Sequence, residues 1–170
     1  MSLSRPVAAL ALAAGALLVI APTAQAATVA APTGTVSAGT EAGAATAFWG
    51  PRYAPGKKAK ALGTLTAKGE DHADLPTADT VKITGKVYDH AASSKVCGWA
   101  VFRITYRAGN QLPFKHRSIR DCTYRTAKNF SFTYRDVYQV ELKVCSEGKR
   151  SKPSDVCLYA GTWKTLYLSK

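Results

Sequence analysis

Apolar and polar side chains alternate residue by residue over much of this 170-residue chain. Residues 80–89 and 96–107 show the pattern best, with Ile83 and Phe102 on their apolar sides. A repeat of two residues is typical of a β-strand that buries one face and exposes the other. No convincing 3.6-residue repeat follows residue 26, so the pattern excludes a mainly helical fold.

The alternating segments, with turn residues between them, predict seven short strands. They are residues 59–68, 80–89, 96–107, 116–125, 129–134, 137–145 and 156–168, the last with a bulge at Gly161. Seven strands of this kind favour one antiparallel β-sandwich or barrel.

The first 26 residues predict export. Arg5 is followed by an apolar run over residues 7–20, and Ala24 and Ala26 form an A-x-A cleavage site. This is the pattern of a secretory signal peptide, and the run is shorter than the roughly 20 apolar residues of a membrane-spanning helix. We therefore expect cleavage after Ala26 and a secreted, extracellular protein with no transmembrane segment in its mature form.

Residues 27–55 are predicted to form a flexible leader. They are rich in Ala, Thr, Gly and Pro, and residues 27–47 contain no aromatic side chain. Such a stretch buries too little apolar surface to offset the entropy lost on ordering. We expect the β-sandwich domain to cover residues 56–170, and a processed propeptide is the alternative for the leader.

All four cysteines fall in the predicted domain, at Cys97, Cys122, Cys145 and Cys157. An exported protein meets an oxidising environment, so four cysteines in a small domain favour two disulfides. A zinc site would need close cysteine pairs or histidine partners, and a redox pair would need C-x-x-C. The spacing of these cysteines fits neither.

Strand registers choose among the three ways of pairing these cysteines. A hairpin that joins the first two sets Ala100 opposite Ile119, apolar against apolar, although Pro113 favours a wide turn. A hairpin that joins the last two sets Val144 opposite Leu158. A slip of one residue would oppose core and solvent faces, so the agreement predicts disulfides within each of these two pairs.

Three segments carry a resemblance to a known family: VKITGKVYD (81–89), VCGWAVFRITYR (96–107), and VYQVELKVC (137–145) followed by SDVCLYA (154–160). They resemble small secreted proteins of unknown function from filamentous actinobacteria such as Streptomyces. Those proteins share an Ala-rich signal peptide, a variable linker and an immunoglobulin-like sandwich with two cysteine pairs.

The resemblance covers roughly residues 80–160 and implies an immunoglobulin- or fibronectin-III-like sandwich. It transfers no functional residue, because the family has no established activity. The distance along the chain from Tyr138 to Cys145 departs from the antibody tyrosine corner, so an antibody-type disulfide between sheets is not implied.

No catalytic pattern occurs in the chain. His72, His90 and His116 lie in or beside predicted loops, and no serine lies in a G-x-S-x-G sequence. Glu70 and Asp71 suit a solvated turn better than a pair of carboxylates that converge on one bond. No phosphate loop or metal-ligand motif is present. We therefore expect neither enzyme activity nor a cofactor.

Charge is the feature that points to a partner. Cleavage after Ala26 would remove Arg5 and no acidic residue, which changes the net charge from +12 to +11. Such a charge attracts polyanions, although a small soluble domain commonly carries a net charge of about 2–8 in magnitude. The candidate anion-binding residues are an N-terminal cluster, Lys57, Lys58 and Lys60, and a loop cluster, Lys149, Arg150 and Lys152. A third group, Lys115, Arg117, Arg120 and Arg125, falls on or near the first predicted hairpin.

These features predict a secreted, non-enzymatic binding protein. Its expected partner is an anionic cell-wall polymer or another secreted protein, and nucleic acid is a weaker alternative. A second hypothesis is an inhibitor of an extracellular hydrolase, with residues 146–156 as a disulfide-braced loop. A secreted enzyme of unrecognised type is the third.

Overall fold

The computed structural model describes residues 44–170, which form an all-β fold of seven antiparallel strands. The strands are β1 (Ala45–Tyr53), β2 (Ala59–Glu70), β3 (Ala78–Asp89), β4 (Val96–Tyr106), β5 (Phe114–Asp121), β6 (Ala127–Gly148) and β7 (Lys164–Leu168). A 3₁₀ turn, η1 (Pro55–Lys57), precedes β2, and a short helix, α1 (Asp155–Tyr159), lies between β6 and β7. The predicted all-β class is confirmed, and the immunoglobulin-like identity stays a prediction.

Several predictions for the N-terminal part of the chain lie outside the described residues. They are the signal peptide, its cleavage site at Ala24 and Ala26, and residues 27–43 of the leader. Between residues 44 and 170, no helix has the length and apolar character needed to cross a membrane.

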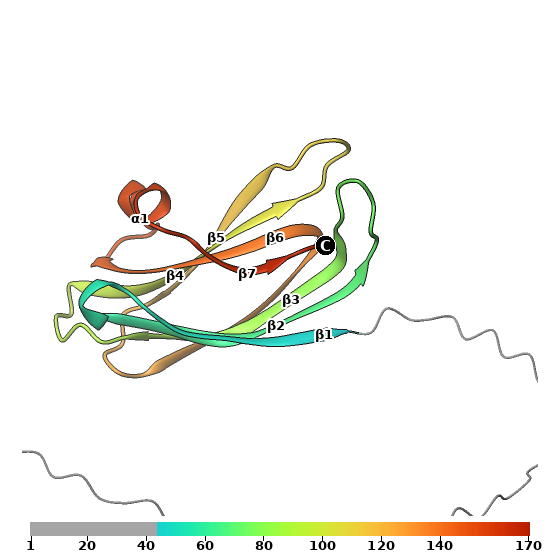
Figure 1. The fold of residues 1–170 in the computed structure, drawn as a ribbon. Helices are drawn as coiled ribbons and strands as arrows, with labels where there is room; N and C mark the ends of the chain where they lie inside the picture. Colours follow the sequence, from blue (N-terminus) through green and yellow to red (C-terminus); the bar gives the residue numbers. More distant parts are fainter. Residues whose placement is uncertain (1–43) are drawn as a thin grey trace, which may run out of the picture. The chain divides into compact units, whose positions relative to one another are not determined.

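Hydrogen bonds join the strands in the order β1-β2-β3-β6-β4-β5, with β7 added to β6. The first half of β6 (residues 127–136) pairs with β3, and the second half (residues 137–148) pairs with β4. The first residue of β6 lies beside the end of β3, and its last residue lies beside the start of β4. β6 therefore runs from one end of the fold to the other and then returns to the end at which it began (Figure 1). The chain reverses at Asp136, where φ is 53°. This is where the sequence predicts a break between two strands.

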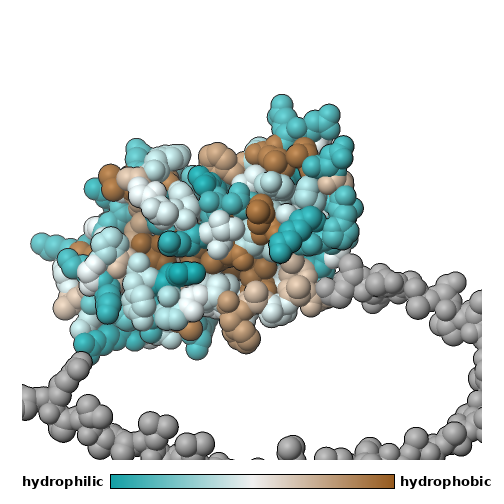
Figure 2. All heavy atoms as spheres, in the orientation of Figure 1, coloured by the Kyte–Doolittle hydropathy of each residue, from teal (hydrophilic) through white to brown (hydrophobic). Residues whose placement is uncertain are grey.

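The reversal of β6 gives the sheet two layers whose apolar faces pack against each other. Phe102 of β4 is fully buried, and its ring centroid lies 5.8 Å from Trp49 of β1 and 5.6 Å from Phe130 of β6. Side chains placed on inner faces by the alternation are buried, including Val81, Ile83, Val87, Ala100, Ile104, Val140 and Leu142. Figure 2 shows that the outside of the face drawn is largely hydrophilic, with apolar residues visible between the layers.

The first strand corrects the predicted domain boundary. Residues 45–53 are predicted to belong to the flexible leader, but they form β1 and pair with β2. Trp49 is only 6% exposed and lies over Gly63 and Gly85, which face each other across β2 and β3. A Cβ atom on these glycines would come within 2.6 Å and 3.0 Å of the indole Cζ2. One buried indole therefore anchors a segment that the sequence pattern assigns to the flexible leader.

The first predicted hairpin is confirmed. Cys97 and Cys122 form a disulfide, and β4 pairs with β5 so that Ala100 lies opposite Ile119. The turn is tight rather than wide, because Ala108 and Gln111 exchange backbone hydrogen bonds of 2.9 Å and 3.2 Å around Gly109 and Asn110. Pro113 fits this register through its carbonyl, which accepts from the N–H of Tyr106 at 3.0 Å.

The second predicted hairpin is wrong, although its disulfide is present. Cys145 and Cys157 are bonded, but Cys157 lies in α1 rather than in a strand. Ser154 begins this helix by accepting a hydrogen bond from the N–H of Cys157 at 3.3 Å. The strand predicted over residues 156–168 is therefore a helical turn followed by β7, and Leu142, not Val144, is the last residue of β6 that pairs with it.

Candidate anion-binding site

Both predicted cation clusters lie at one end of the fold. β2 begins there beside the end of β3, and β4 begins there beside the end of β6. The N-terminal cluster precedes or opens β2, and the loop cluster follows β6. We call this the basic end, and its cations are Lys57, Lys58, Lys60, Lys95, Arg120, Arg125, Lys149, Arg150 and Lys152.

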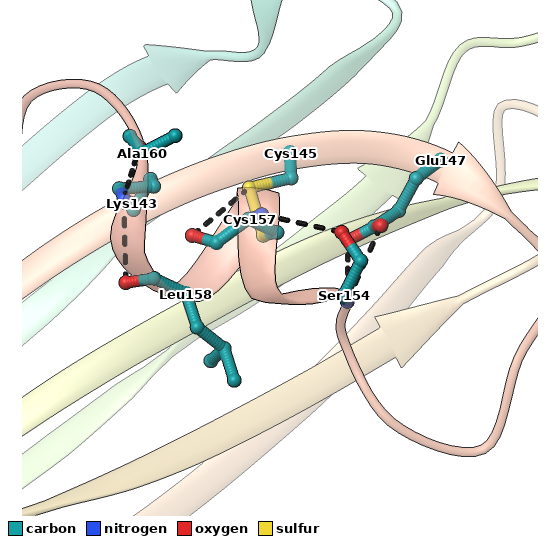
Figure 3. Close-up of a disulfide and its surroundings, with 7 residues drawn as sticks. All are labelled: Lys143, Cys145, Glu147, Ser154, Cys157, Leu158 and Ala160. Atoms are coloured by element: carbon teal, nitrogen blue, oxygen red, sulfur yellow. Dashed lines mark hydrogen bonds between the residues drawn. A yellow bond between two sulfur atoms is a disulfide. The ribbon is translucent and has the colours of Figure 1, made fainter.

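The loop cluster is fixed to neighbouring strands by its backbone. The N–H of Lys149 donates to the carbonyl of Lys95 at 2.8 Å, and the Arg120 guanidinium on β5 donates to the carbonyl of Arg150. At the base of the loop, both carboxylate oxygens of Glu147 lie 3.3 Å from the N–H of Ser154 (Figure 3). Residues 146–156 are thus the end of β6, a tethered loop and the start of α1, not the single loop that the inhibitor hypothesis expects.

The N-terminal cluster is more exposed. Lys57 and Lys58 face solvent, whereas the Lys60 ammonium lies 4.2 Å from the ring centroid of Tyr88. In the described part of the chain, the ion pairs are Arg103–Glu141 at 2.6 Å and Arg107–Asp71 at 2.5 Å. Among the described residues, therefore, no carboxylate lies within 4 Å of any cation of the basic end.

A hollow of about 430 Å³ extends from the basic end along one side of the fold. It lies between β5 and the first half of β6, each of which pairs with another strand on one side only. Its polar lining consists of Arg117, Ser118, Arg120, Lys128, Asn129, Ser131 and Ser151. Among residues 44–170, no acidic side chain lines it. We call this hollow the basic groove.

Aromatic rings form the floor of the basic groove. Phe130 and Phe132 are half-buried, and the Arg117 guanidinium lies 5.8 Å from the ring centroid of Phe132. Lys115 lies 4.6 Å from the ring centroids of both Tyr106 and Tyr134. Such cations cover the rings with their stems and keep their charges in water. Inward-pointing charges also keep an edge strand from pairing with another sheet. Protection of the β5 edge is therefore a purely structural role that Lys115 and Arg117 can serve without any ligand.

The outer face of the second layer carries a separate packed cluster. Trp99 is only 2% exposed there, beneath residues of α1 and beside Trp163. His116 stacks on Trp163 with ring centroids 5.6 Å apart. Burial, and then the charges of Arg103 and Lys143, lower the pKa of His116. This histidine is therefore less protonated near neutral pH than an exposed histidine.

The remaining histidines and the adjacent carboxylates do not converge on one site. His72 lies 2.9 Å from the terminal carbonyl of Lys170, and His90 lies beside Tyr88 at the basic end. Asp71 closes the loop after β2, and the backbone N–H of Thr77, followed by the nearby Arg107, lowers the pKa of Asp71 to about 2.

Glu70 accepts a hydrogen bond of 2.5 Å from the hydroxyl of Tyr167. Burial and this bond raise the pKa of Tyr167 to about 12. Possible ligand atoms of Cys145, Glu147 and Cys157 lie within 4.8 Å of one another, but both sulfurs are in the disulfide and offer no thiolate to a metal.

Sequence reasoning found most cations of the site, but it found neither Lys128 nor the groove. Lys128 and Asn129 were missed because β5 and the first half of β6 belong to different layers, and their proximity depends on how β6 reverses. The usable signal was the alternation, which places Lys115 and Arg117 on the same face as the buried Ile119.

Comparisons with protein-family models, curated proteins and solved structures give no match to this chain.

Proposed function

We propose that this protein is a secreted binding protein for an anionic polymer of the cell envelope. The polymer lies along the basic groove and continues onto the basic end. The observation that carries the proposal is the lining of the groove, which combines Arg117, Arg120 and Lys128 and includes no acidic side chain from the described part of the chain. The two disulfides support the extracellular setting.

The chemistry of the groove suits phosphate groups in particular. Guanidinium groups bind phosphate through paired hydrogen bonds, and Arg117 and Arg120 supply two of them. Asn129, Ser131 and Ser151 add neutral donors along the same walls. An open trough that leads to a further cluster of cations suits a chain of repeated charges better than a single small anion.

Binding of this kind should depend steeply on salt. For duplex DNA, log K falls with log salt with a slope of about −0.9 for each phosphate neutralised, and other polyanions should show the same sign. The probe is poly(glycerol phosphate), titrated by calorimetry from about 50 mM to about 300 mM salt. Single-stranded DNA and poly-glutamate tested in parallel distinguish a phosphate polymer from a nucleic acid and from a carboxylate polymer.

The decisive variant is Arg117→Gln with Lys128→Gln, because glutamine keeps part of the stem that covers the rings. Its matched control is Lys82→Gln with Lys86→Gln, which removes the same charge from the exposed face of β3. We expect the groove variant to bind about tenfold more weakly, with a flatter salt slope, and the control to bind nearly as the unmodified protein does. Equal losses in both variants, or no salt-sensitive binding at about 50 mM, would reduce the charge to a solubility feature.

A further inference from the structure

The opposite open side of the fold holds a larger hollow of about 660 Å³. One wall is the end of β1 with η1, and the other is α1 with residues 160–164. Between them lies an unbroken run of β6, residues 142–147. We call this hollow the edge cavity.

The run of β6 in the edge cavity is a free sheet edge. β4 pairs with the second half of β6 on one side, but β7 pairs with it on the other side only over residues 139–142. The chain that leads into β7 comes from α1, which the Cys145–Cys157 disulfide holds against the sheet (Figure 3). Among the described residues, no strand pairs with residues 143–147 on the side away from β4. A sheet edge of this kind is a template for an added strand.

Within the part of the chain that the structure describes, one polar side chain on this run lacks a hydrogen-bond partner, and one buried cation is held by neutral groups alone, two carbonyls and the ring of Trp163. The hydroxyl oxygen of Ser146 is buried and makes no hydrogen bond within residues 44–170. Lys143 is 8% exposed, and its ammonium donates to the carbonyls of Leu158 at 3.5 Å and Ala160 at 2.5 Å (Figure 3). In the described part of the chain, no carboxylate lies within 4 Å of that ammonium. Buried polar groups are normally satisfied, and a buried charge is normally paired.

The remaining walls favour an acidic and partly apolar occupant. Arg52 and Lys164 add two cations to the cavity lining. Glu147 is the one acid among the described lining residues, and its oxygens already face the N–H of Ser154. Tyr53 and Val156 also line the cavity and are 47% and 73% exposed, so they offer apolar contacts near its rim.

We propose that the edge cavity binds an extended peptide segment of a partner protein that carries acidic side chains, added as a strand to residues 143–147 of β6. Main-chain hydrogen bonds to the free edge would supply affinity, and alternate side chains would meet the cations and the apolar rim. Five residues of strand span about 17 Å at about 3.4 Å each, and pockets of about 300–1,000 Å³ are the usual size for bound ligands. This site uses none of the residues of the basic groove.

The test uses the intact chain and three synthetic peptides of six residues with blocked ends. One alternates valine with glutamate, the second alternates valine with lysine, and the third is the acidic peptide with alternate backbone nitrogens methylated. Calorimetry measures affinity, and amide hydrogen exchange locates binding. We expect the acidic peptide to bind and to protect amides within residues 143–147. The lysine peptide should bind at least about tenfold more weakly, and N-methylation should abolish binding because it removes main-chain donors.

Two variants sharpen the location. Lys143→Met should weaken binding of the acidic peptide about tenfold, and Ser146→Ala should weaken it about threefold. These losses match the usual free-energy contributions of hydrogen bonds to charged and to neutral groups. Lys82→Met on β3 removes one charge from an exposed site and should leave affinity unchanged. The proposal is overturned if the unmodified protein binds no acidic peptide, does not distinguish it from the lysine or N-methylated peptide, or shows protection on β5 instead. These comparisons need no variant, so they decide the matter even if Lys143→Met does not fold.

Discussion

The two open sides of this fold are both bordered by edge strands, but they are completed differently. On the groove side, Lys115 and Arg117 turn inward over Tyr134 and Phe132, so cations cover the rings where the layers part. On the cavity side, Trp49 fills the core from β1. There, residues 143–147 of β6 keep one backbone edge to which no strand of residues 44–170 pairs. An edge strand whose cations point inward disfavours an added strand and attracts an extended anion. An edge whose backbone N–H and C=O groups are unpaired can accept an added strand.

Each side has its own disulfide. Cys97–Cys122 joins β4 to the residue that follows β5 at the basic end, with Cα atoms 4.3 Å apart, and holds β5 as a wall of the groove. Cys145–Cys157 joins β6 to α1 across 6.0 Å between Cα atoms and holds a wall of the edge cavity. The same covalent bond therefore serves a strand pair on one side and a strand–helix contact on the other.

The largest expected effect is on the cavity side, at Trp49. Trp49→Ala should lower the free energy of unfolding by about 3–5 kcal/mol, because it empties the space above Gly63 and Gly85. Phe48→Ala is the matched control in the same strand, since Phe48 is 89% exposed, and should change stability by less than about 0.5 kcal/mol. Urea denaturation measures both. Equal effects would mean that residues 45–53 do not belong to the folded domain.

Removing the disulfides one at a time should separate the two sides. Closed loops of 25 and 12 residues correspond to about 3.5 and about 2.8 kcal/mol of stability in the chain-entropy account. Replacing Cys145 and Cys157 by alanine should therefore destabilise slightly less than replacing Cys97 and Cys122, and should weaken the acidic peptide more than the polymer. Thermal unfolding and the two binding assays check this. The division between the sides fails if both replacements impair both ligands equally.

The two cysteine pairs also show what sequence can and cannot predict here. The β4–β5 register was predictable because both arms alternate and a turn at Gly109 and Asn110 separates them. For Cys145 and Cys157 the disulfide was predictable, but the hairpin register was wrong. The reason is that α1 is only five residues long, which is too short for its sequence to show a helical repeat. Ser154 followed by Asp155 was the overlooked clue, since such residues often begin a helix.

The sequence did not reveal β1 or the two proposed ligand sites, because they depend on contacts between distant segments. Three aromatic residues, Phe48, Trp49 and Tyr53, follow an Ala- and Thr-rich stretch, and only Trp49 is buried. Its burial needs the paired glycines of β2 and β3. The basic groove and the edge cavity both follow from the reversal of β6 at Asp136, which decides which strand edges stay free. A one-dimensional pattern identifies strands and inner faces but not edges.

The smallest expected effect, a shift in pH dependence, distinguishes the two sides most directly. Burial, and then the nearby charge of Arg103 on β4, lower the pKa of Lys143 from its ordinary 10.5. The Lys143 ammonium therefore loses its proton at a lower pH than an exposed lysine, and affinity for the acidic peptide should fall as pH rises through that range. His116 on β5 also faces this group, but its pKa is lowered from 6.5, so it is neutral throughout the alkaline range.

The basic groove should behave differently over the same pH range. It presents the guanidinium groups of Arg117 and Arg120, and arginine keeps its charge under these conditions. Calorimetric titrations of both ligands between about pH 7 and about pH 10 should show the acidic peptide weakening first while poly(glycerol phosphate) stays bound. In Lys143→Met, the residual peptide affinity should lose this early alkaline decline. Parallel loss of both ligands in the unmodified protein would show that one set of lysines serves both, and the contrast between a charged side and a bare edge would not hold.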